Sequence, residues 1–535
     1  MLPLSRSIRL VVLLSCLSFG AQAREPVVAR EFMVSAAHPL AAQVGYDILA
    51  RGGSAVDAAI AVQMVLGLVE PESSGIGGGA FLLHWSQREQ KVRSYDGRET
   101  APAAARADRF VRDGKPMGFM EAVVGGRSVG VPGVLRMLEL AHQKHGRLPW
   151  AELFQPAILA AEQGFPLSPR LYAVLQDEQY LRKDPSALRV YYGKTVGERI
   201  VNPEYAATLR ALATRGASAM YEGPIAADMV RAVRAQKGDL TAADMRGYRA
   251  MEREPLCGAY RVWRICSMGP PSSGGVGVLQ ILGILERVPF AGAPVVPAVH
   301  YFSEAGRLAY ADRARYLGDP AFSSIPLARL LSPDYLDKRA KLIGERSMRR
   351  AMPGDFESGT SHFSIVEPNG DAVAMTTTIE SGFGSRIMVR GFLLNNELTD
   401  FDFTPGGPNE VRGGKRPRSS MAPTMVFDRQ GNLQLLIGSP GGSQIINFVA
   451  KVLVGVLDWK LDIQGAIDLP NFGSRNGPTQ IERSSRYEAL VPALTERGHD
   501  IRLSEMESGL HGIERVPGGW RGGADPRREG VALGR

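Results

Sequence analysis

Thr360 is the residue in this sequence whose setting best suits nucleophilic chemistry. It follows Gly359 at the junction between a polar stretch, GDFESG, and a strand-like stretch, SHFSIV. A threonine hydroxyl is a weak nucleophile. Cleavage of the Gly359–Thr360 bond would release an α-amino group with a pKa of about 7.7–8.0, which can accept the hydroxyl proton. One residue would then supply both the nucleophile and the base of an acyl-transfer reaction.

Other motifs resemble catalytic signatures but lack the context that those signatures need. The Gly-x-Ser-x-Gly of residues 126–130 is followed by a Pro-Gly pair, whereas a nucleophile elbow turns directly into a helix. The glycines of residues 75–79 follow a helix pattern and precede a strand, the reverse of a dinucleotide fingerprint. Residues 413–415 lack the upstream glycine and the Ser/Thr of a phosphate-binding loop. His142 and His145 have no acidic partner at metal-binding spacing, so we expect no cofactor and no metal ion.

The elements that must position this chemistry form a helix-rich part followed by a strand-rich part. Residues 55–69 are apolar on nearly all sides and follow a capping-box-like start at Ser54, which predicts a buried helix. Two strands at residues 80–85 and 91–96 lead directly into Arg98. The further helices that we predict in this part span residues 134–144, 150–163, 225–235 and 276–288.

Beyond residue 354 the apolar pattern changes to the alternation of strands. Residues 361–366 and 372–378 are separated by the turn sequence PNGD and predict a β-hairpin that begins next to Thr360. Further strands are predicted at residues 391–396, 422–427 and 433–437, and a helix at 444–458. This order of elements favours sheets covered by helices over separate small domains.

Composition and charge restrict the class of protein. The chain has 535 residues, 44% of them hydrophobic, with 63 basic and 55 acidic residues and a net charge of +8. No run of five like charges occurs, so a nucleic-acid-binding stripe is not expected.

The N-terminus has the pattern of an export signal. Residues 1–23 combine two arginines, a short apolar core and an Ala-x-Ala ending, which predicts a secretory signal peptide. No stretch has the length of a membrane span, so we expect an exported protein without one, in a bacterial periplasm. Release from the cell, or lipid anchoring through Cys16, is the less favoured alternative.

Two cysteines remain after the predicted signal peptide, Cys257 and Cys266. A hairpin that turns at residues 261–262 would place them opposite each other at a non-hydrogen-bonded position. A cross-strand disulfide is then possible in an oxidising compartment, and two unbonded thiols are the equally favoured alternative.

Several long motifs, in a fixed order, resemble the γ-glutamyltransferase (glutathione hydrolase) family. They are DGRETAP, PESSGIGGGAF and GPPSSGG in the first part, and GTSHFSIVEPNGDAVAMTTTIESGFGS, LLNNELTDF, KRPRSSMAPT and GSPGG in the second. The resemblance implies an α+β fold, the four-layer αββα sandwich of N-terminal-nucleophile hydrolases. It also implies a precursor that cuts itself before Thr360, so that residues 24–359 become a large subunit and residues 360–535 a small, catalytic subunit of a heterodimer.

The same resemblance assigns roles to residues of this sequence. Arg98 would hold the α-carboxylate of a γ-glutamyl group, with hydroxyl donors from Ser419 and Ser420. Three acids would face the α-ammonium of the γ-glutamyl group. Two glycines before a helix would direct backbone N–H groups at the oxyanion. Thr378 would position Thr360. The three acids are Glu380, Glu397 and Asp400, and the two glycines are Gly441 and Gly442.

The implied reaction transfers the γ-glutamyl group of glutathione and related compounds to Thr360, and then to water or to an amino-acid or peptide acceptor. Glu380 stands where many relatives have asparagine, so we expect repulsion within the acid trio to raise at least one pKa. A short segment between Asp400 and Ser419 predicts a short or absent lid. The alternatives are a glutaryl- or cephalosporin-type acylase of the same fold and an unprocessed, non-enzymatic scaffold. The acid trio argues against the acylase, because a glutaryl group has no ammonium.

Overall fold

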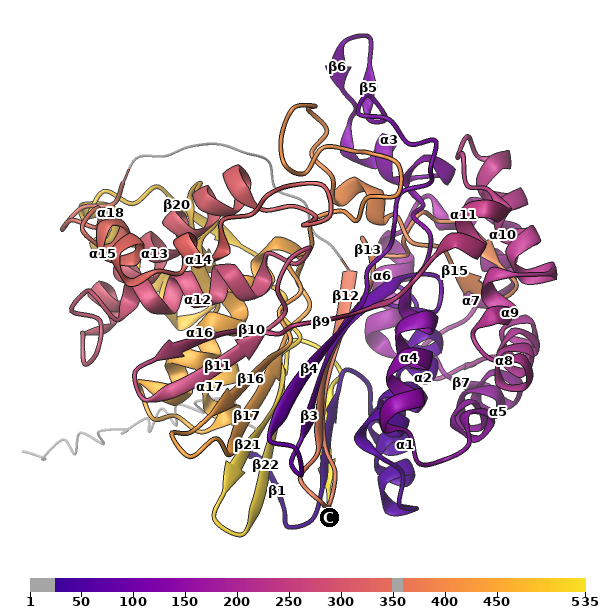
Figure 1. The fold of residues 1–535 in the computed structure, drawn as a ribbon, viewed down its shortest axis with the longest axis horizontal. Coiled ribbons are helices and arrows are strands. Elements are labelled where there is room, and N and C mark those ends of the chain that lie inside the picture. Colours follow the sequence, from indigo (N-terminus) through magenta and orange to yellow (C-terminus); the bar gives the residue numbers. More distant parts are fainter. Residues whose placement is uncertain (1–24, 349–358) are drawn as a thin grey trace, which may run out of the picture.

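The chain folds into two facing β-sheets with a layer of helices on each outer side (Figure 1). The computed structural model describes residues 25–348 and 359–535, so the predicted signal peptide of residues 1–23 lies outside the described residues. The arrangement is the predicted four-layer αββα sandwich. No helix in the described part of the chain combines the length and the apolar character that a membrane crossing requires.

In the described part of the chain, each of the two large sheets has seven strands, and neighbouring strands run antiparallel. Sheet A has the order β1 (Val27–Ala29), β22 (Gly519–Ala524), β21 (His511–Val516), β17 (Leu433–Gly438), β16 (Thr424–Phe427), β11 (Trp263–Ser267), β10 (Leu256–Tyr260). Sheet B has the order β23 (Val531–Gly534), β2 (Met33–Ala36), β12 (Gly359–Val366), β13 (Ala372–Glu380), β3 (Gly79–Ser86), β4 (Lys91–Gly97), β9 (Met251–Arg253). Both sheets therefore combine strands from before and after Thr360.

The helices divide between the two outer faces (Figure 1). The layer on sheet B includes α1 (Pro39–Ala50), α2 (Ala55–Val69), α4 (Val134–His145), α5 (Gln155–Gln163), α6 (Pro169–Asp177), α7 (Pro185–Tyr191), α8 (Pro203–Arg215), α9 (Ser218–Tyr221), α10 (Pro224–Ala235) and α11 (Ala242–Gly247). The layer on sheet A includes α12 (Gly274–Leu285), α13 (Val295–Tyr316), α15 (Pro333–Ala340), α16 (Ile445–Leu457), α17 (Ile463–Asp468) and α18 (Val491–Glu496).

Shorter helices and small groups of strands lie outside the two large sheets. They are the helices α3 (Phe119–Val123) and α14 (Leu327–Leu330), the strand pairs β5 (Val111–Arg112) with β6 (Lys115–Pro116), β7 (Phe165–Pro166) with β8 (Arg199–Ile200) and β14 (Met388–Val389) with β15 (Phe392–Leu393), and the three strands β18 (Phe472–Ser474), β19 (Thr479–Glu482) and β20 (Ile501–Ser504).

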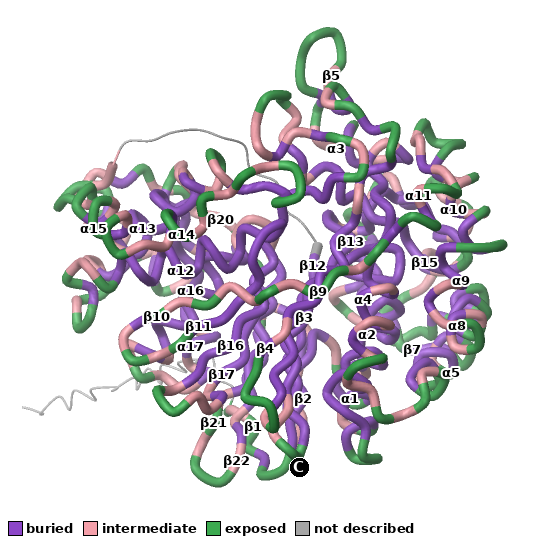
Figure 2. The backbone as a smooth tube through the Cα atoms, in the orientation of Figure 1, coloured by how far each residue is buried: buried purple, intermediate pink, exposed green. Residues whose placement is uncertain are grey.

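The middle of the molecule is formed by buried residues (Figure 2). Apolar side chains of both sheets meet there, among them Trp85 and Phe427, whose ring centroids lie 4.7 Å apart. The helix α2 behaves as its composition predicts: every residue from Ala55 to Val69 is buried, and Ser54 forms a capping box with Asp57. An all-round apolar helix can only be stable inside such a core.

Most predicted strands and helices are confirmed, with two differences. Of the single strand predicted at residues 391–396, only the two residues of β15 form a strand. This strand pairs with β14 in a tight hairpin, because Arg390 and Gly391 adopt positive φ values of 47° and 86° and turn the chain. The helix predicted at 150–163 begins as a 3₁₀ turn, Trp150–Phe154, and continues as α5, which has Pro156 in its first turn.

The hairpin β10–β11 settles the two alternatives for the cysteines. Cys257 lies opposite Cys266 in the strand register, and the two form a disulfide with a Cα–Cα distance of 4.1 Å. The expected placement of the two cysteines opposite each other is therefore confirmed, and of the two alternatives the structure has the disulfide.

Candidate active site

The proposed nucleophile, Thr360, lies near the start of β12 in the middle of sheet B. It is buried, with 2% of its surface exposed, and it is paired with Thr378 of β13. The two hydroxyl oxygens are 3.4 Å apart, and Thr378 Oγ1 also accepts a hydrogen bond of 2.7 Å from the backbone N–H of Glu380. The strand register shifts between Gly359 and Thr360. Thr378 thus contacts the residue that it was predicted to position.

The backbone next to Thr360 is held by charged groups that the sequence analysis did not single out. Arg528 Nη1 donates a hydrogen bond of 3.0 Å to the Thr360 carbonyl oxygen and reaches Ser73 Oγ at 3.4 Å. The neighbouring Ser361 hydroxyl donates to Glu70 Oε2 at 2.6 Å. Burial, followed by the nearby Arg170, lowers the pKa of Arg528. The sequence ADPR at residues 524–527, directly before Arg528, was the available signal for this residue.

Gly441 and Gly442 form a turn that other residues could not adopt without strain. The turn follows β17, and the φ values are 124° for Gly441 and 52° for Gly442. A Cβ atom on Gly441 would lie 2.6 Å from the Phe448 ring. Gly442 begins a 3₁₀ turn, Gly442–Gln444, that runs directly into α16. The turn therefore has the strand-to-helix setting in which backbone N–H groups are available to an oxyanion.

Arg98 lies at the centre of a buried cluster of charged groups. It follows β4, and its surface is fully buried. Its guanidinium donates to Glu397 and to Asp400, both of which belong to a 3₁₀ turn, Glu397–Asp400, and Glu99 lies 3.8 Å away. Arg98 Nε also donates to the Pro417 carbonyl at 3.1 Å. Three of the residues predicted to bind substrate are thus in direct contact with one another.

Burial is the main reason that the carboxyl groups of this cluster are hard to ionise. It raises the pKa of Glu397 to about 7, against an attraction to Arg98 that lowers it. It also raises the pKa of Glu380 well above its ordinary value, and the charges of Asp400 and Glu397 add to this effect. The predicted direction is confirmed, but repulsion within the trio is the secondary cause. The pKa of Glu99, a fourth acid that the sequence analysis missed, is raised by burial and by Glu397.

Glu380 adopts an unusual backbone conformation for a residue other than glycine. Its φ value is +78°, at the point where β13 ends, and its side chain is buried. Glu380 Oε2 accepts a hydrogen bond from the side-chain amide of Asn396. Asn396 is the residue before Glu397, so this bond links the third acid of the trio to the turn that carries the other two.

The two serines have different partners. Ser419 Oγ accepts a hydrogen bond of 3.1 Å from the backbone of Met421, and Ser420 Oγ accepts one of 2.9 Å from Arg313 Nη2. Arg313 also donates to Ser273 Oγ at 2.8 Å. Burial, followed by the neighbouring Arg418, lowers the pKa of Arg313 to about 9. Arg313 comes from the long helix α13, and no local motif indicated that it would reach this site.

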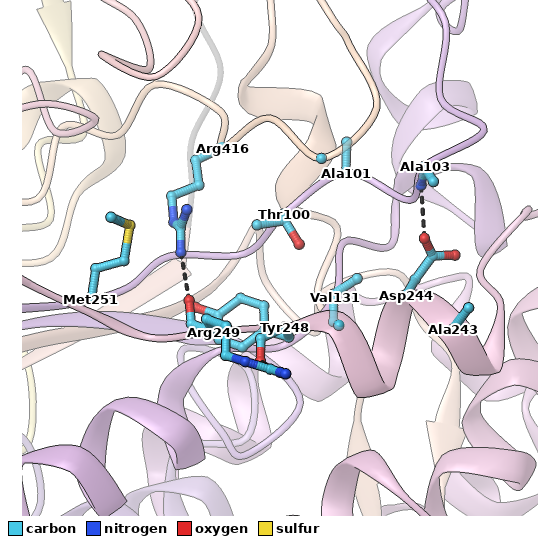
Figure 3. A pocket seen from close by; sticks show the side chains of 12 residues that line it. Thr100, Ala101, Ala103, Val131, Ala243, Asp244, Tyr248, Arg249, Met251 and Arg416 are labelled. Carbon is cyan, nitrogen blue, oxygen red and sulfur yellow. Dashed lines mark hydrogen bonds between the residues drawn. The ribbon is translucent and has the colours of Figure 1, made fainter.

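The backbone of Arg98 is held by a hydrogen bond from Tyr248. The Tyr248 hydroxyl donates to the Arg98 carbonyl oxygen at 2.7 Å. Tyr248 lines a cavity of about 400 Å³ together with Thr100 and Arg416, and Arg416 donates to the backbone of Arg249 at 2.8 Å (Figure 3). The hydrogen bond from Tyr248 holds the backbone that carries Arg98.

The segment between Asp400 and Ser419, where a short or absent lid was predicted, contacts the first part of the chain. Phe403, between Asp400 and Ser419, stacks on Phe110 with ring centroids 4.6 Å apart, so this short segment is packed against the first part of the chain.

Within the described residues, one group has metal-ligating potential: His300, Glu304 and His499. His300 Nδ1 lies 2.8 Å from His499 Nε2, and Glu304 accepts hydrogen bonds from Ser347 Oγ at 2.7 Å and Met348 N at 2.9 Å. The group is a hydrogen-bonded network that joins α13 to residues 347–348 and 499.

Comparison with known proteins agrees with this architecture. The family described as gamma-glutamyltranspeptidase matches residues 41–535. The glutathione hydrolase proenzyme of Bacillus subtilis (strain 168) is 36% identical, with 96% of this chain and 95% of that protein covered. The acylase ACY 1 proenzyme of Pseudomonas sp. (strain V22) is 34% identical, with coverages of 94% and 93%. The crystal structure of cephalosporin acylase from Bacillus halodurans superposes with a TM-score of 0.87 at 28% identity, covering 98% of this chain and 99% of that one.

Proposed function

Because the chain belongs to the gamma-glutamyltranspeptidase family, we propose that it is an exported γ-glutamyltransferase and glutathione hydrolase that uses Thr360 as an N-terminal nucleophile. The observation that carries this proposal is the buried cluster of Arg98 with Glu397 and Asp400. A γ-glutamyl group ends in both a carboxylate and an ammonium. A site that combines a guanidinium with several carboxylates complements both charges at once.

The precursor would first cut its own chain. Thr360 Oγ attacks the Gly359 carbonyl carbon, and the peptide C–N bond breaks as the acyl group moves to oxygen. Water then hydrolyses the ester, which leaves a carboxylate on Gly359 and an α-amino group on Thr360. The large and small subunits would remain together as a heterodimer because both sheets contain strands from each.

Turnover would repeat the same chemistry on a substrate. The α-amino group of Thr360 accepts the hydroxyl proton while Oγ attacks the γ-carbonyl carbon, and the N–H groups at Gly441 and Gly442 stabilise the oxyanion. The proton passes to the leaving amine as the amide C–N bond breaks. Water or an acceptor amine then attacks the ester, the bond to Oγ breaks, and Oγ regains its proton.

An acylase acting on glutaryl-type side chains is the second candidate, and the similarity to acylases favours it. The carboxylate cluster argues against it, because a glutaryl group offers no positive charge to Glu397 or Asp400. An uncharged group placed over these acids would exclude solvent from them and would add no positive charge to that of Arg98.

The proposal is tested by the intact mass of the purified protein together with hydrolysis of two anilides. Two chains, the second beginning at Thr360, and release of p-nitroaniline from γ-glutamyl-p-nitroanilide would support the proposal. Two chains, with release of p-nitroaniline only from glutaryl-p-nitroanilide, would favour the acylase. A single chain inactive on both would favour a scaffold that retains the fold.

A further inference from the structure

Arg313 is a guanidinium near the proposed γ-glutamyl site that has no carboxylate partner among the described residues. Its side chain donates instead to two hydroxyl oxygens, Ser420 Oγ at 2.9 Å and Ser273 Oγ at 2.8 Å. Arg313 is partly exposed, so a bound molecule can approach it. An arginine in such a setting keeps a positive charge that an anion can neutralise.

Arg98, in contrast, is surrounded by carboxyl groups. It donates to Glu397 and to Asp400, and Glu99 lies 3.8 Å away. This cluster contains more carboxyl groups than guanidinium groups, which suits the ammonium of a γ-glutamyl group. The α-carboxylate of the same group would therefore gain from a positive charge outside the cluster.

Arg98 and Arg313 contact the same short segment, residues 417–420. Arg98 Nε donates to the Pro417 carbonyl oxygen at 3.1 Å, at the start of the segment. Arg313 Nη2 donates to the side chain of Ser420, at its end. The segment that carries the two predicted serine donors is thus held by both guanidinium groups.

The charge of Arg313 is poorly compensated by its surroundings. Burial, followed by the neighbouring Arg418, lowers the pKa of Arg313 to about 9, and Asp400 opposes this effect without forming an ion pair. Because Asp400 also accepts a hydrogen bond from Arg98, Arg313 lies within electrostatic reach of the acid cluster. Arg313 would therefore stabilise an anion that binds at Ser420.

Arg313 also determines how the Ser420 hydroxyl can be used. A guanidinium only donates, so Ser420 Oγ accepts in this bond and keeps its own proton for another acceptor. Among the described residues, no acceptor for that proton is found. The hydroxyl is thus held as a donor whose proton is available to a carboxylate, and a hydrogen bond to a charged acceptor is a strong one.

Ser273 holds the guanidinium in this position. Its Oγ accepts a hydrogen bond from Arg313 Nε and donates one of 2.6 Å to the Ser419 carbonyl oxygen. The backbone N–H of Ser273 donates to the same carbonyl oxygen at 2.8 Å. Arg313 is therefore connected to both serines that were predicted to bind the α-carboxylate.

We propose that Arg313 is a positioning residue of the γ-glutamyl site. Its guanidinium directs the Ser420 hydroxyl at the α-carboxylate of the substrate, and its positive charge strengthens that hydroxyl as a donor. This inference rests on the proposed function, since it assigns the residue a role in binding a γ-glutamyl group. Arg98 and Arg313 then divide the work: Arg98 organises the acids that face the ammonium, and Arg313 acts through Ser420 on the carboxylate.

The test compares two competitive inhibitors at pH 8, with γ-glutamyl-p-nitroanilide as the donor. L-Glutamate and L-isoglutamine differ only at the α-carboxylate, which is an amide in isoglutamine. The inhibition constant of isoglutamine divided by that of glutamate therefore measures what the carboxylate contributes. Arg313→Gln should lower this ratio about five- to tenfold, the equivalent of one hydrogen bond. It should raise KM for the donor more than it changes kcat.

Two further variants separate positioning from a merely structural role. In a Ser420→Ala background, Arg313→Gln should change the ratio less than twofold, because the hydroxyl through which Arg313 acts is absent. Arg313→Lys keeps the charge without the planar fork and should give an intermediate ratio. The control is Arg315→Gln, whose ratio should equal that of the wild type, since Arg315 is exposed on the same helix and contacts the Tyr316 ring.

The outcomes distinguish this role from the proposed function. If the processed wild type releases p-nitroaniline but the ratio in Arg313→Gln stays within twofold of the wild type, the role of Arg313 is overturned and the proposed function stands. If the processed wild type does not act on the donor, the proposed function fails and the role of Arg313 with it. If Arg313→Gln does not fold, wild-type ratios in Arg313→Lys and Ser420→Ala would overturn the proposal.

Discussion

Replacing Arg98 with glutamine removes the guanidinium that links Glu397 to Asp400. Arg98 is fully buried, so its hydrogen bonds to charged groups are little screened by solvent. A charged hydrogen bond of this kind contributes about 1.5–3 kcal/mol. If one such bond holds the α-carboxylate of the donor, its loss raises KM for γ-glutamyl-p-nitroanilide about 10- to 150-fold. Arg98 makes no described contact with Thr360, so cleavage into two chains should continue.

The variant also removes one partner of a buried ion pair, which costs about 3–5 kcal/mol of unfolding free energy. A control must therefore separate binding from stability. Arg109→Gln is suitable, because Arg109 is also buried and forms two hydrogen bonds of 2.8 Å with Asp239. The assay combines intact mass, denaturant unfolding and steady-state kinetics of both variants. A KM for Arg98→Gln within threefold of the control, in a processed and folded protein, would remove Arg98 from the pocket.

Three further predictions address the nucleophile, the acid cluster and the disulfide. Thr360→Ala should remain one inactive chain by intact mass, and normal cleavage of this variant would contradict the self-processing scheme. Glu397, with a pKa of about 7, is mostly ionised at pH 8 and mostly protonated at pH 6. L-Glutamate has an ammonium, so its inhibition constant as a competitive inhibitor should rise about tenfold from pH 8 to pH 6, whereas that of glutarate should not. The same pH dependence of the two inhibition constants would contradict this role of Glu397. Replacing Cys257 and Cys266 with alanine opens a short loop and should lower the unfolding free energy by about 2–3 kcal/mol in denaturant titrations, and an unchanged midpoint would show that the bond adds no stability.

Elements with strong local patterns could be predicted from the sequence. The helix α2 is apolar on all sides and has a capping box, and the hairpin β12–β13 combines alternation with a PNGD turn, so local rules determined both. The same hairpin brought Thr360 opposite Thr378. The position of Cys257 opposite Cys266 also followed from counting along a tight hairpin, although whether they are bonded did not.

Groups that reach the site through tertiary contacts could not be predicted in this way. Arg313 lies near the end of a long helix with the composition of an ordinary helix surface, and only the packing of α13 brings it to Ser420. Arg528 is more than 150 residues from Thr360 in sequence, yet it contacts its carbonyl oxygen. The leading cause of the raised pKa values was also missed, because burial is a property of the fold and not of neighbouring residue types.

The order of strands in the two sheets would limit refolding after the proposed cleavage. In sheet B, β12 and β13 lie between β2 on one side and β3 on the other, and in sheet A, β16 lies next to β11. The precursor can assemble this interleaved order as a single chain, with the two parts always at high effective concentration. Two separate chains would have to find each other at their actual concentration, with unpaired strand edges exposed meanwhile. Cleavage at Thr360 would therefore make unfolding hard to reverse. The precursor folds as one chain and gains its nucleophile once, whereas the cleaved protein, if it later unfolds, would have to refold by a bimolecular reaction in competition with aggregation.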